Sequence, residues 1–274
     1  MSDSATEPAD AGRGGWPARI AVIGTGAMGS AFVAGLARAR PTGEEIEVVD
    51  VRRDVAEVVA KESHARVTEM ASAASADVVV LAVKPKDAAA ALETLAPRMS
   101  ASAVLMSVVA GLDLERIRGV ASAQVVRLMP SLAIRHGKGL IVAAAGADQA
   151  EALTRGRPLL ERLGRVVEAQ EELFAAATAL VGSGPGLMAL VAEGLEDGAV
   201  ACGFTRQDAR DMVAATIAGT AALLADGSDP SDLRQRVSSP AGTTVAGLSV
   251  LERGAVRGHI ADAVIAAAKR ADEL

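Results

Sequence analysis

The sequence lacks several features by which large classes of protein are recognised. It contains a single cysteine, Cys202, so it has neither a disulfide framework nor a thiolate metal cluster, and a reducing cytoplasm suits it best. Aromatic residues are scarce, with three Phe and one Trp, and the lysines are scattered rather than gathered in a basic stripe. Together with a net charge of −6, this composition argues against nucleic-acid binding.

Long apolar runs and histidine clusters are also missing. Glycine, proline or charge interrupts every apolar run well short of a membrane span, and the polar N-terminus has no signal-peptide pattern. The three histidines, His64, His136 and His259, show no metal-ligand spacing. We therefore expect a cytoplasmic protein that holds no metal and binds neither membrane nor nucleic acid.

What the sequence does contain is enough apolar residue for one large or two modest cores, because half of its 274 residues are hydrophobic. Residues 1–17 are small, polar and Gly/Pro-rich, which predicts a disordered leader. Strand and helix patterns alternate over residues 18–168, and alanine-rich helical patterns fill residues 169–274. This change predicts two domains, a doubly wound α/β domain followed by an all-helical one.

The predicted elements can be named by their apolar patterns. Short apolar runs predict strands at residues 20–23, 45–50, 77–83, 103–109, 124–129, 140–145 and 165–168. Longer periodic patterns in the second half predict helices at Leu173–Ala179, Gly186–Cys202, Arg206–Ala225 and Gly242–Arg270. The helical half is unusually apolar, so a dimer interface explains it more economically than an ordinary bundle core, which is the alternative.

A glycine-rich turn follows the first predicted strand and opens a helix. Gly24 allows the tight turn, Gly26 lets a pyrophosphate approach the backbone, and Gly29 lets the helix pack on its strand. The order of strand, turn and helix predicts a Rossmann-type dinucleotide site rather than a turn that collects glycine by chance. Its residues are Gly24, Gly26, Ala27, Met28 and Gly29.

The end of the second predicted strand carries two conflicting signals about the cofactor. Asp50 stands where an acidic side chain accepts hydrogen bonds from the adenosine ribose, which favours NAD. Arg52 and Arg53 follow at once, and a guanidinium there holds a 2′-phosphate, which favours NADP. For either arginine, a solvated turn is the alternative. The cofactor is therefore predicted as NADPH or NADH.

Two further segments contain residues suited to ligand binding. Lys84 follows the central strand at residues 77–83, where ligands sit in open α/β sheets, although an exposed lysine is common at such a place. Near residue 240, Ser239 is predicted to cap a helix whose first turn contains Pro240. The hydroxyls of Thr243 and Thr244 join backbone N–H groups there, which predicts an anion site sized for a carboxylate, with a simple capped helix as the alternative.

Taken together, these motifs resemble the Δ1-pyrroline-5-carboxylate reductase family. The resemblance spans nearly the whole chain from Arg19 and includes a Ser-Pro-Gly-Gly-Thr-Thr-like signature followed by Leu-Glu, Gly and Arg. The segments that carry it are the glycine loop, Ala82–Pro85, Ala110–Gly111, Arg127–Pro130, Gly182–Pro185, Asp197–Val200, Gly203, Val237–Leu248, Leu251–Gly254 and Arg257.

The resemblance implies a reaction and a set of site residues. It implies hydride transfer from a nicotinamide cofactor to the C=N bond of 1-pyrroline-5-carboxylate, giving L-proline, in a homodimer that family members often assemble into larger rings. Thr244 matches a threonine that hydrogen-bonds the imine nitrogen. The substrate carboxylate is expected to bind Ser239, Pro240, Ala241, Gly242, Thr243 and Thr244, and the cofactor site is expected to include Ala82, Val83, Lys84, Pro85, Ala110 and Met129.

Three departures from the family pattern keep other functions open. The family's Met-Pro-Asn-Thr-Pro is replaced by Met-Pro followed by Ser131, Leu132 and Ala133. The Ala-Tyr that follows Gly-Ser-Gly-Pro in the family is replaced by Gly186 and Leu187, and Ala241 replaces the first glycine of the carboxylate loop. The alternatives are a paralogue that reduces a different cyclic imino acid and a non-catalytic, cofactor-binding dimer. A β-hydroxyacid dehydrogenase is disfavoured, because the helical half contains a single lysine near its end, Lys269.

Overall fold

The computed structural model describes residues 17–40, 44–146 and 149–273. Backbone contacts divide the chain into two compact units. We call them the sheet unit, which runs to Gly182 and includes the residues from Ala268 onward, and the helical unit, Ser183–Ala267. Apart from Pro17, the predicted leader lies outside the described residues.

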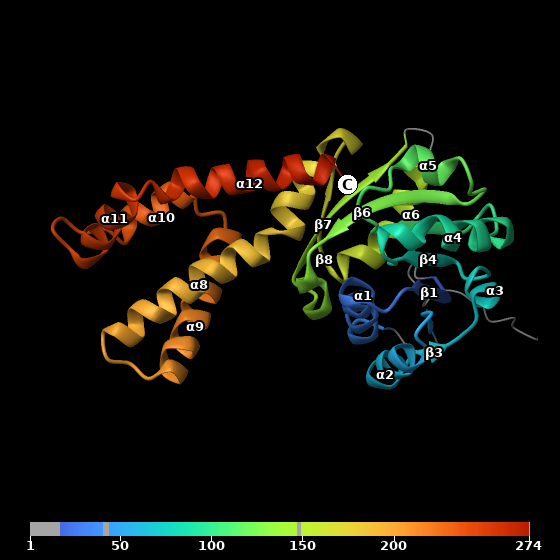
Figure 1. The fold of residues 1–274 in the computed structure, drawn as a ribbon, viewed down its shortest axis with the longest axis horizontal. Helices are drawn as coiled ribbons and strands as arrows, with labels where there is room; N and C mark the ends of the chain where they lie inside the picture. The colour runs from blue at the N-terminus through green and yellow to red at the C-terminus, as the bar shows by residue number, and fades with distance from the viewer. Residues whose placement is uncertain (1–16, 41–43, 147–148, 274) are drawn as a thin grey trace, which may run out of the picture. The chain divides into compact units, whose positions relative to one another are not determined.

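The sheet unit is built on one eight-stranded sheet (Figure 1), with strand order β3-β2-β1-β4-β5-β6-β7-β8. All neighbouring strands are parallel except β6 and β7, which are antiparallel. The strands are β1 (Arg19–Ile23), β2 (Glu45–Val49), β3 (Arg66–Val67), β4 (Val78–Leu81), β5 (Val104–Ser107), β6 (Gln124–Pro130), β7 (Gly139–Ala145) and β8 (Gly164–Glu168). The predicted doubly wound fold is thus confirmed, and β3, too short to leave an apolar pattern, is the strand that the sequence did not reveal.

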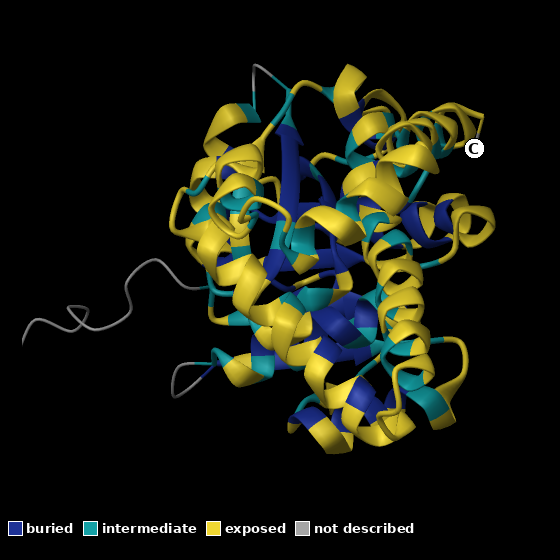
Figure 2. Cartoon of the chain, turned by 90° about the vertical axis from the view of Figure 1, so that its left-hand side faces the viewer, coloured by how far each residue is buried: buried dark blue, intermediate teal, exposed yellow. Residues whose placement is uncertain are grey.

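Helices cover both faces of this sheet, so its central strands β1, β4 and β5 are buried on either side. Alternate residues of β1 belong to different cores: Ile20 and Val22 pack with Phe32 on one face, and Ala21 and Ile23 pack on the other. Figure 2 shows buried strands in the interior and largely exposed helices outside them. The helices are α1 (Ala27–Arg38), α2 (Arg53–Ser63), α3 (Met70–Ala73), α4 (Pro85–Leu95), α5 (Leu114–Arg118), α6 (Ala150–Glu161) and α7 (Phe174–Ala177).

The segment that follows β8 still packs with the sheet unit. Phe174, Ala179 and Val181 are all buried there, with exposed fractions of at most 4%. A short π-helical turn, Thr178–Gly182, ends this segment. The compact sheet unit therefore extends past residue 168, where the change of sequence pattern placed the domain boundary, because these apolar side chains cover the sheet.

The helical unit contains α8 (Gly184–Ala201), α9 (Arg206–Ala225), α10 (Pro230–Arg236), α11 (Thr243–Arg253) and most of α12 (Val256–Asp272). The short helix α10 was not predicted. The prediction of one helix over Gly242–Arg270 was wrong. The structure has two helices there, α11 and α12, separated by a turn at Gly254 and Ala255. Ala255 takes a left-handed conformation there, with φ of 51°, which no continuous α-helix allows.

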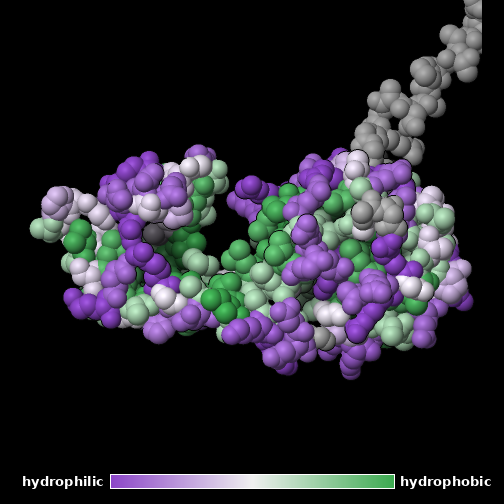
Figure 3. All heavy atoms as spheres, turned by 90° about the horizontal axis from the view of Figure 1, so that it is seen from above, coloured by the Kyte–Doolittle hydropathy of each residue, from purple (hydrophilic) through white to green (hydrophobic). Residues whose placement is uncertain are grey.

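Apolar side chains of the helical unit lie largely on its surface, and Figure 3 shows exposed hydrophobic surface on the molecule. The stretch Glu171–Ala201 is long and apolar enough, by length and composition alone, to cross a membrane, because an 18-residue window within it has a mean hydropathy of 1.6. The glycines and proline near residue 184 were expected to interrupt this apolar run, but they break the helical backbone only at Ser183, between the π-helical turn and α8. A single stretch of this kind is weak evidence for a membrane span, because core helices of soluble proteins pass the same test.

Candidate functional site

The glycine turn between β1 and α1 has the geometry of a phosphate cradle. Gly24 has a φ of +93°, and a Cβ atom on it would lie 2.7 Å from the carbonyl oxygen of Ala82. A Cβ on Gly29 would collide with the carbonyl oxygen of Gly24. Around Gly26, by contrast, no atom lies within 4 Å of such a Cβ. The outer two glycines are therefore required by packing within the turn, and the middle one faces open space that a pyrophosphate can enter.

The start of α1 can receive an anion. Gly26 is its N-cap and supplies no side-chain cap, and the first turn contains no acidic residue. The unpaired N–H groups of a helix start and the positive end of its dipole favour negative charge at this place. The residues present thus fit the diphosphate of a dinucleotide.

Asp50, predicted to bind the ribose, makes its hydrogen bonds within the protein. Its Oδ2 accepts from the backbone N and from the Oγ1 of Thr25, both at 2.7 Å, and its Oδ1 accepts from the backbone N of Arg52 at 2.9 Å. The carboxylate is 8% exposed. Burial by itself raises the pKa of Asp50, but these hydrogen bonds outweigh burial and hold the pKa below its usual range. Asp50 therefore stays charged near neutral pH and ties β2 to the glycine loop.

The two arginines after Asp50 face solvent at the start of α2. The side chain of Arg52 is 63% exposed and that of Arg53 is 70% exposed. Arg53 lies 3.1 Å from Glu57 and 3.7 Å from Glu69, in pairs that are open to water. Both guanidinium groups are accessible to a ligand.

The remaining predicted cofactor residues gather at the carboxyl edge of the parallel strands. The N–H of Ala82 donates to the carbonyl of Ile23 at 2.8 Å, so the end of β4 lies beside the glycine turn. Lys84 is exposed and is the N-cap of α4, with Pro85 as the first helical residue. Ala110 is half-buried after β5, and Met129 is buried in β6.

One charged residue at this edge was missed as a candidate. Strand register places Arg127 of β6 beside Ser107, in one row with Leu81 and Ile23. Its guanidinium is 12% exposed, donates to Glu171 at 2.8 Å and lies 4.7 Å from the ring centre of Phe174. Its Nε is buried without a hydrogen-bond partner among the described residues. The available signal was a single arginine inside an otherwise apolar strand.

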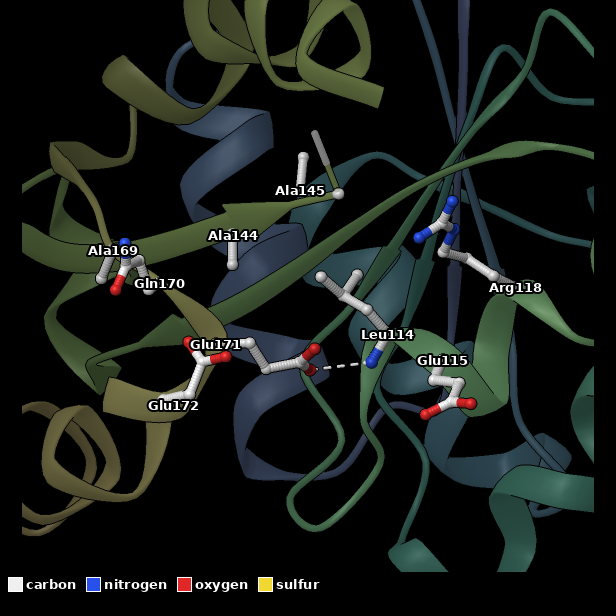
Figure 4. A pocket seen from close by; sticks show the side chains of 10 residues that line it. Leu114, Glu115, Arg118, Ala144, Ala145, Ala169, Gln170, Glu171 and Glu172 are labelled. Carbon is white, nitrogen blue, oxygen red and sulfur yellow. Dashed lines mark hydrogen bonds between the residues drawn. The ribbon is translucent and has the colours of Figure 1, made fainter. Parts of the chain in front are cut away.

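Glu171 extends this network to the next helix. As Figure 4 shows, its Oε1 also accepts from the backbone N of Leu114, at 2.7 Å, where α5 begins. The carboxylate lines a cavity of about 420 Å³ with Glu172 and Gln170, while Arg127 and Ala110 line a neighbouring cavity of about 370 Å³. The network thus fixes the segment after β5 relative to β6.

In the helical unit, the predicted carboxylate site lies in the loop between α10 and α11. The cap of α11 is Gly242, without a side-chain hydrogen bond, so the predicted capping by Ser239 was wrong. Pro240 lies before the helix, whose first residue is Thr243, so its predicted place in the first turn was also wrong. Ala241 has a φ of 57°, a left-handed conformation that an alanine adopts at a cost.

This loop keeps the properties of an anion site. A Cβ on Gly242 would meet the Oγ of Ser239, so a side chain at this position would require that hydroxyl to move. The first turn of α11 contains no acidic residue, and Thr243 and Thr244 add hydroxyls to its N–H groups. A carboxylate fits this combination, because both the dipole and the donors favour an anion. The phosphate cradle and this loop therefore belong to different compact units.

Comparison with known proteins gives consistent matches to both units. A family model described as pyrroline-5-carboxylate reductase dimerisation matches residues 171–274, and one described as NADP oxidoreductase coenzyme F420-dependent matches residues 19–111. Pyrroline-5-carboxylate reductase of Corynebacterium melassecola is 37% identical, over 93% of this chain and 98% of that protein. The Mycobacterium tuberculosis enzyme is 35% identical, over 94% and 97% of the respective chains.

Solved structures agree with these matches. The pyrroline-5-carboxylate reductase of Coxiella burnetii aligns with a TM-score of 0.83 at 28% identity, covering 93% of this chain and 97% of that one. The pyrroline carboxylate reductase of Plasmodium falciparum, solved with NADP bound, aligns with a TM-score of 0.80 at 25% identity, covering 93% and 97%.

Proposed function

Because this chain belongs to the pyrroline-5-carboxylate reductase family, we propose that it reduces the C=N bond of 1-pyrroline-5-carboxylate to give L-proline, the last step of proline biosynthesis. NADPH or NADH is the hydride donor. The observation that carries the proposal is the presence, in one chain matched along nearly its full length, of a phosphate cradle and a separate carboxylate loop.

The cofactor supplies a hydride, and the protein holds both reactants. The glycine turn and the N-terminus of α1 bind the diphosphate, and Ala82, Val83, Lys84 and Pro85 border the nicotinamide side, with Ala110 and Met129 beyond them. The loop Ser239–Thr244 binds the substrate carboxylate through N–H groups and hydroxyls. A protonated imine is already an electrophile, so positioning and electrostatics can supply most of the catalysis.

Thr244 is the residue that we assign to the reacting atoms. Its Oγ1 accepts a hydrogen bond from the protonated ring nitrogen, which holds the proton on that nitrogen and orients the C=N bond. The half-buried position of Thr244 in the first turn of α11, beside the carboxylate donors, supports this role.

A paralogue acting on another cyclic imino acid is the second candidate, and one observation favours it. The Oγ of Ser131 accepts from the backbone N of Leu140 at 3.1 Å, so this hydroxyl is engaged with β7. Leu132 beside it is 46% exposed and presents an apolar side chain. Where the family usually has an asparagine amide and a threonine hydroxyl, this chain therefore presents less polarity to a ligand.

We further propose that the protein is a cytoplasmic homodimer, in which a second copy covers the apolar face of the helical unit, and that such dimers are the unit from which a larger ring would be built. The match to a dimerisation family over residues 171–274 supports the dimer. The same covering accounts for the apolar stretch Glu171–Ala201 without a membrane, and the net charge of −6 disfavours nucleic acid as a partner.

The test is oxidation of NADPH and of NADH, measured separately, by the purified protein with 1-pyrroline-5-carboxylate and, in parallel, with a six-membered cyclic imino acid. We expect turnover with the five-membered substrate, and Thr244→Val to lower kcat/KM by about 100-fold, while Thr244→Ser retains most activity. Thr216→Val, whose hydroxyl bonds within α9, is the control. Cofactor binding without turnover of the five-membered imine would overturn the proposal, and turnover of the larger ring alone would establish the paralogue.

A further inference from the structure

The acidic residue at the end of β2 is usually the residue that distinguishes NAD from NADP. It does so by accepting hydrogen bonds from the ribose hydroxyls, which requires carboxylate oxygens that point outward and remain free. By sequence position, Asp50 is that residue, and it predicts a preference for NADH. Its geometry is different.

The hydrogen-bonding capacity of Asp50 is largely used inside the protein. Three donors reach its carboxylate within 2.9 Å: the N–H and the hydroxyl of Thr25 and the N–H of Arg52. Thr25 is itself buried, with 3% of its surface exposed. With 8% of its side chain exposed, Asp50 has little surface left for two ribose hydroxyls.

These bonds hold the glycine loop in place. Thr25 is the residue between Gly24 and Gly26, so the carboxylate of Asp50 is hydrogen-bonded to the centre of the phosphate cradle. The N–H of Gly24 also donates to the carbonyl of Val49, the residue before Asp50, at 2.7 Å. The end of β2 therefore fixes the loop through adjacent residues, and the cradle is shaped before any ligand enters.

Two exposed arginines follow β2 at the start of α2, with exposed carboxylates of Asp54, Glu57 and Glu69 nearby. Arg52 and Arg53 are mostly exposed. The Nε of Arg52 lies 3.9 Å from the Oδ1 of Asp50, a long pair that leaves the rest of its guanidinium open to solvent. The ion pairs that Arg53 makes with Glu57 and Glu69 are surface pairs of small energetic value. A phosphate dianion forms stronger, charge-assisted hydrogen bonds with a guanidinium than an exposed carboxylate retains in water.

We propose that Asp50 is a positioning residue that holds the glycine loop through Thr25, and that Arg52 and Arg53 read the 2′-phosphate, so that this chain selects NADPH over NADH despite its acidic residue. This inference rests on the dinucleotide site of the proposed function. Under this proposal Asp50 determines the shape of the diphosphate site, and Arg52 and Arg53 supply the charge that distinguishes NADPH from NADH.

Direct binding separates these tasks without any turnover. We would measure dissociation constants of NADPH, NADH, 2′,5′-ADP and 5′-AMP by calorimetry for the wild type, Thr25→Val, Thr25→Ser, Asp50→Asn and Arg52→Ala/Arg53→Ala. Thr25→Val keeps the backbone donor but removes the hydroxyl donor to Asp50, and Thr25→Ser restores it. Circular dichroism checks that each variant is folded.

We expect Thr25→Val and Asp50→Asn to weaken NADPH and NADH by similar factors, with the ratio of the two constants changing less than threefold, and Thr25→Ser to bind like the wild type. The double arginine variant should lose about tenfold or more in affinity for NADPH and 2′,5′-ADP while NADH and 5′-AMP change little. A tenfold change of the ratio in Asp50→Asn with no effect of Thr25→Val would overturn the inference.

The outcome for the proposed function is read separately. A wild type that binds dinucleotides as expected but does not reduce the imine would contradict the proposed reaction and leave the roles of Asp50 and the arginines standing. A wild type that binds neither dinucleotide would overturn both.

Discussion

The two compact units of this chain bury their apolar side chains to very different extents. In the sheet unit, both faces of the sheet carry continuous cores whose large members, such as Phe32, Leu81 and Leu105, are essentially inaccessible to water. Among the described residues of the helical unit, Ala209 and Val213 alone are buried. Leu190 is the extreme case, with 68% of its surface exposed.

This difference indicates how each unit is stabilised. Burial of apolar surface is the main favourable term in folding, so the sheet unit holds the larger share of it within its own chain. The helical unit leaves Met188, Val191 and Leu195 of α8, spaced along one helix face, exposed to solvent. Under the proposed dimer, a second copy supplies the missing half of its core.

The largest expected effect comes from placing a charge on α8 at Leu190, which has 68% of its surface exposed and lies on another side of the helix. Leu190→Glu would cost less than about 0.5 kcal/mol if the residue stayed in water, as surface substitutions do. If a second copy covers it, an unpaired carboxylate becomes buried, which is far more costly. We expect dissociation to monomer in sedimentation velocity and a loss of helical signal in circular dichroism.

Glu193→Gln, at an exposed position on the same helix, serves as the control and should remain dimeric. A Leu190→Glu variant that sediments and melts like the wild type would mean that this side chain stays in water, and the comparison between the units would lose its explanation.

A smaller effect is expected in the sheet unit and depends on pH. Glu44 is 7% exposed, and burial raises its pKa to about 7, against the opposing pull of Arg162 and Arg40. Below pH 4.5 the carboxyl is protonated in both states. As pH rises from 4.5 to 7, the unfolded state loses its proton first, so the folded state loses stability, and above pH 7 this loss is complete.

Glu44→Gln removes that penalty. Its melting temperature should match the wild type near pH 4.5 and exceed it by about 2–6 °C at pH 8, measured by thermal denaturation across this range. Glu93→Gln, on the exposed face of α4, removes a charge without burial and is the control. Because Glu44, Arg40 and Arg162 all belong to the sheet unit, the same pH dependence should persist in the Leu190→Glu background.

The same contrast explains how far the sequence alone could lead. Strands buried on both faces leave near-continuous apolar runs, which is why β1, β4 and β5 were predicted, and the spacing of three glycines predicted the turn that joins β1 to α1. The family resemblance was likewise readable from local motifs. Each of these features depends on residues that are close together in the sequence, so a local pattern is enough to predict it.

Features that depend on contacts between distant segments were not predictable in this way. Asp50 stands at the sequence position of a ribose ligand, and its partner Thr25, 25 positions earlier, is what turns its carboxylate inward. Arg127 gains its burial from Glu171 and Phe174, far along the chain. A local feature was missed as well. The last predicted helix is divided at Ala255 by one backbone angle, and alanine ordinarily favours a helix, so its residue type gives no sign of the break.

The smallest expected effect concerns two alanines of the helical unit that share a left-handed conformation, Ala241 with φ of 57° and Ala255 with φ of 51°. Replacing either with glycine relieves backbone strain but increases the entropy of the unfolded chain, so the net gain in stability should be about 0.5 kcal/mol or less in both.

The two substitutions should differ in their consequences for function. Ala241 stands in the proposed carboxylate loop, where removal of its methyl group opens the backbone to the substrate, whereas Ala255 lies at the turn between α11 and α12. We expect Ala241→Gly to lower KM for the imine by a few-fold while Ala255→Gly leaves it unchanged, as measured by steady-state kinetics. Equal KM values in the two variants would show that the loop before α11 does not bind the substrate, and the helical unit would then be left with association as its function.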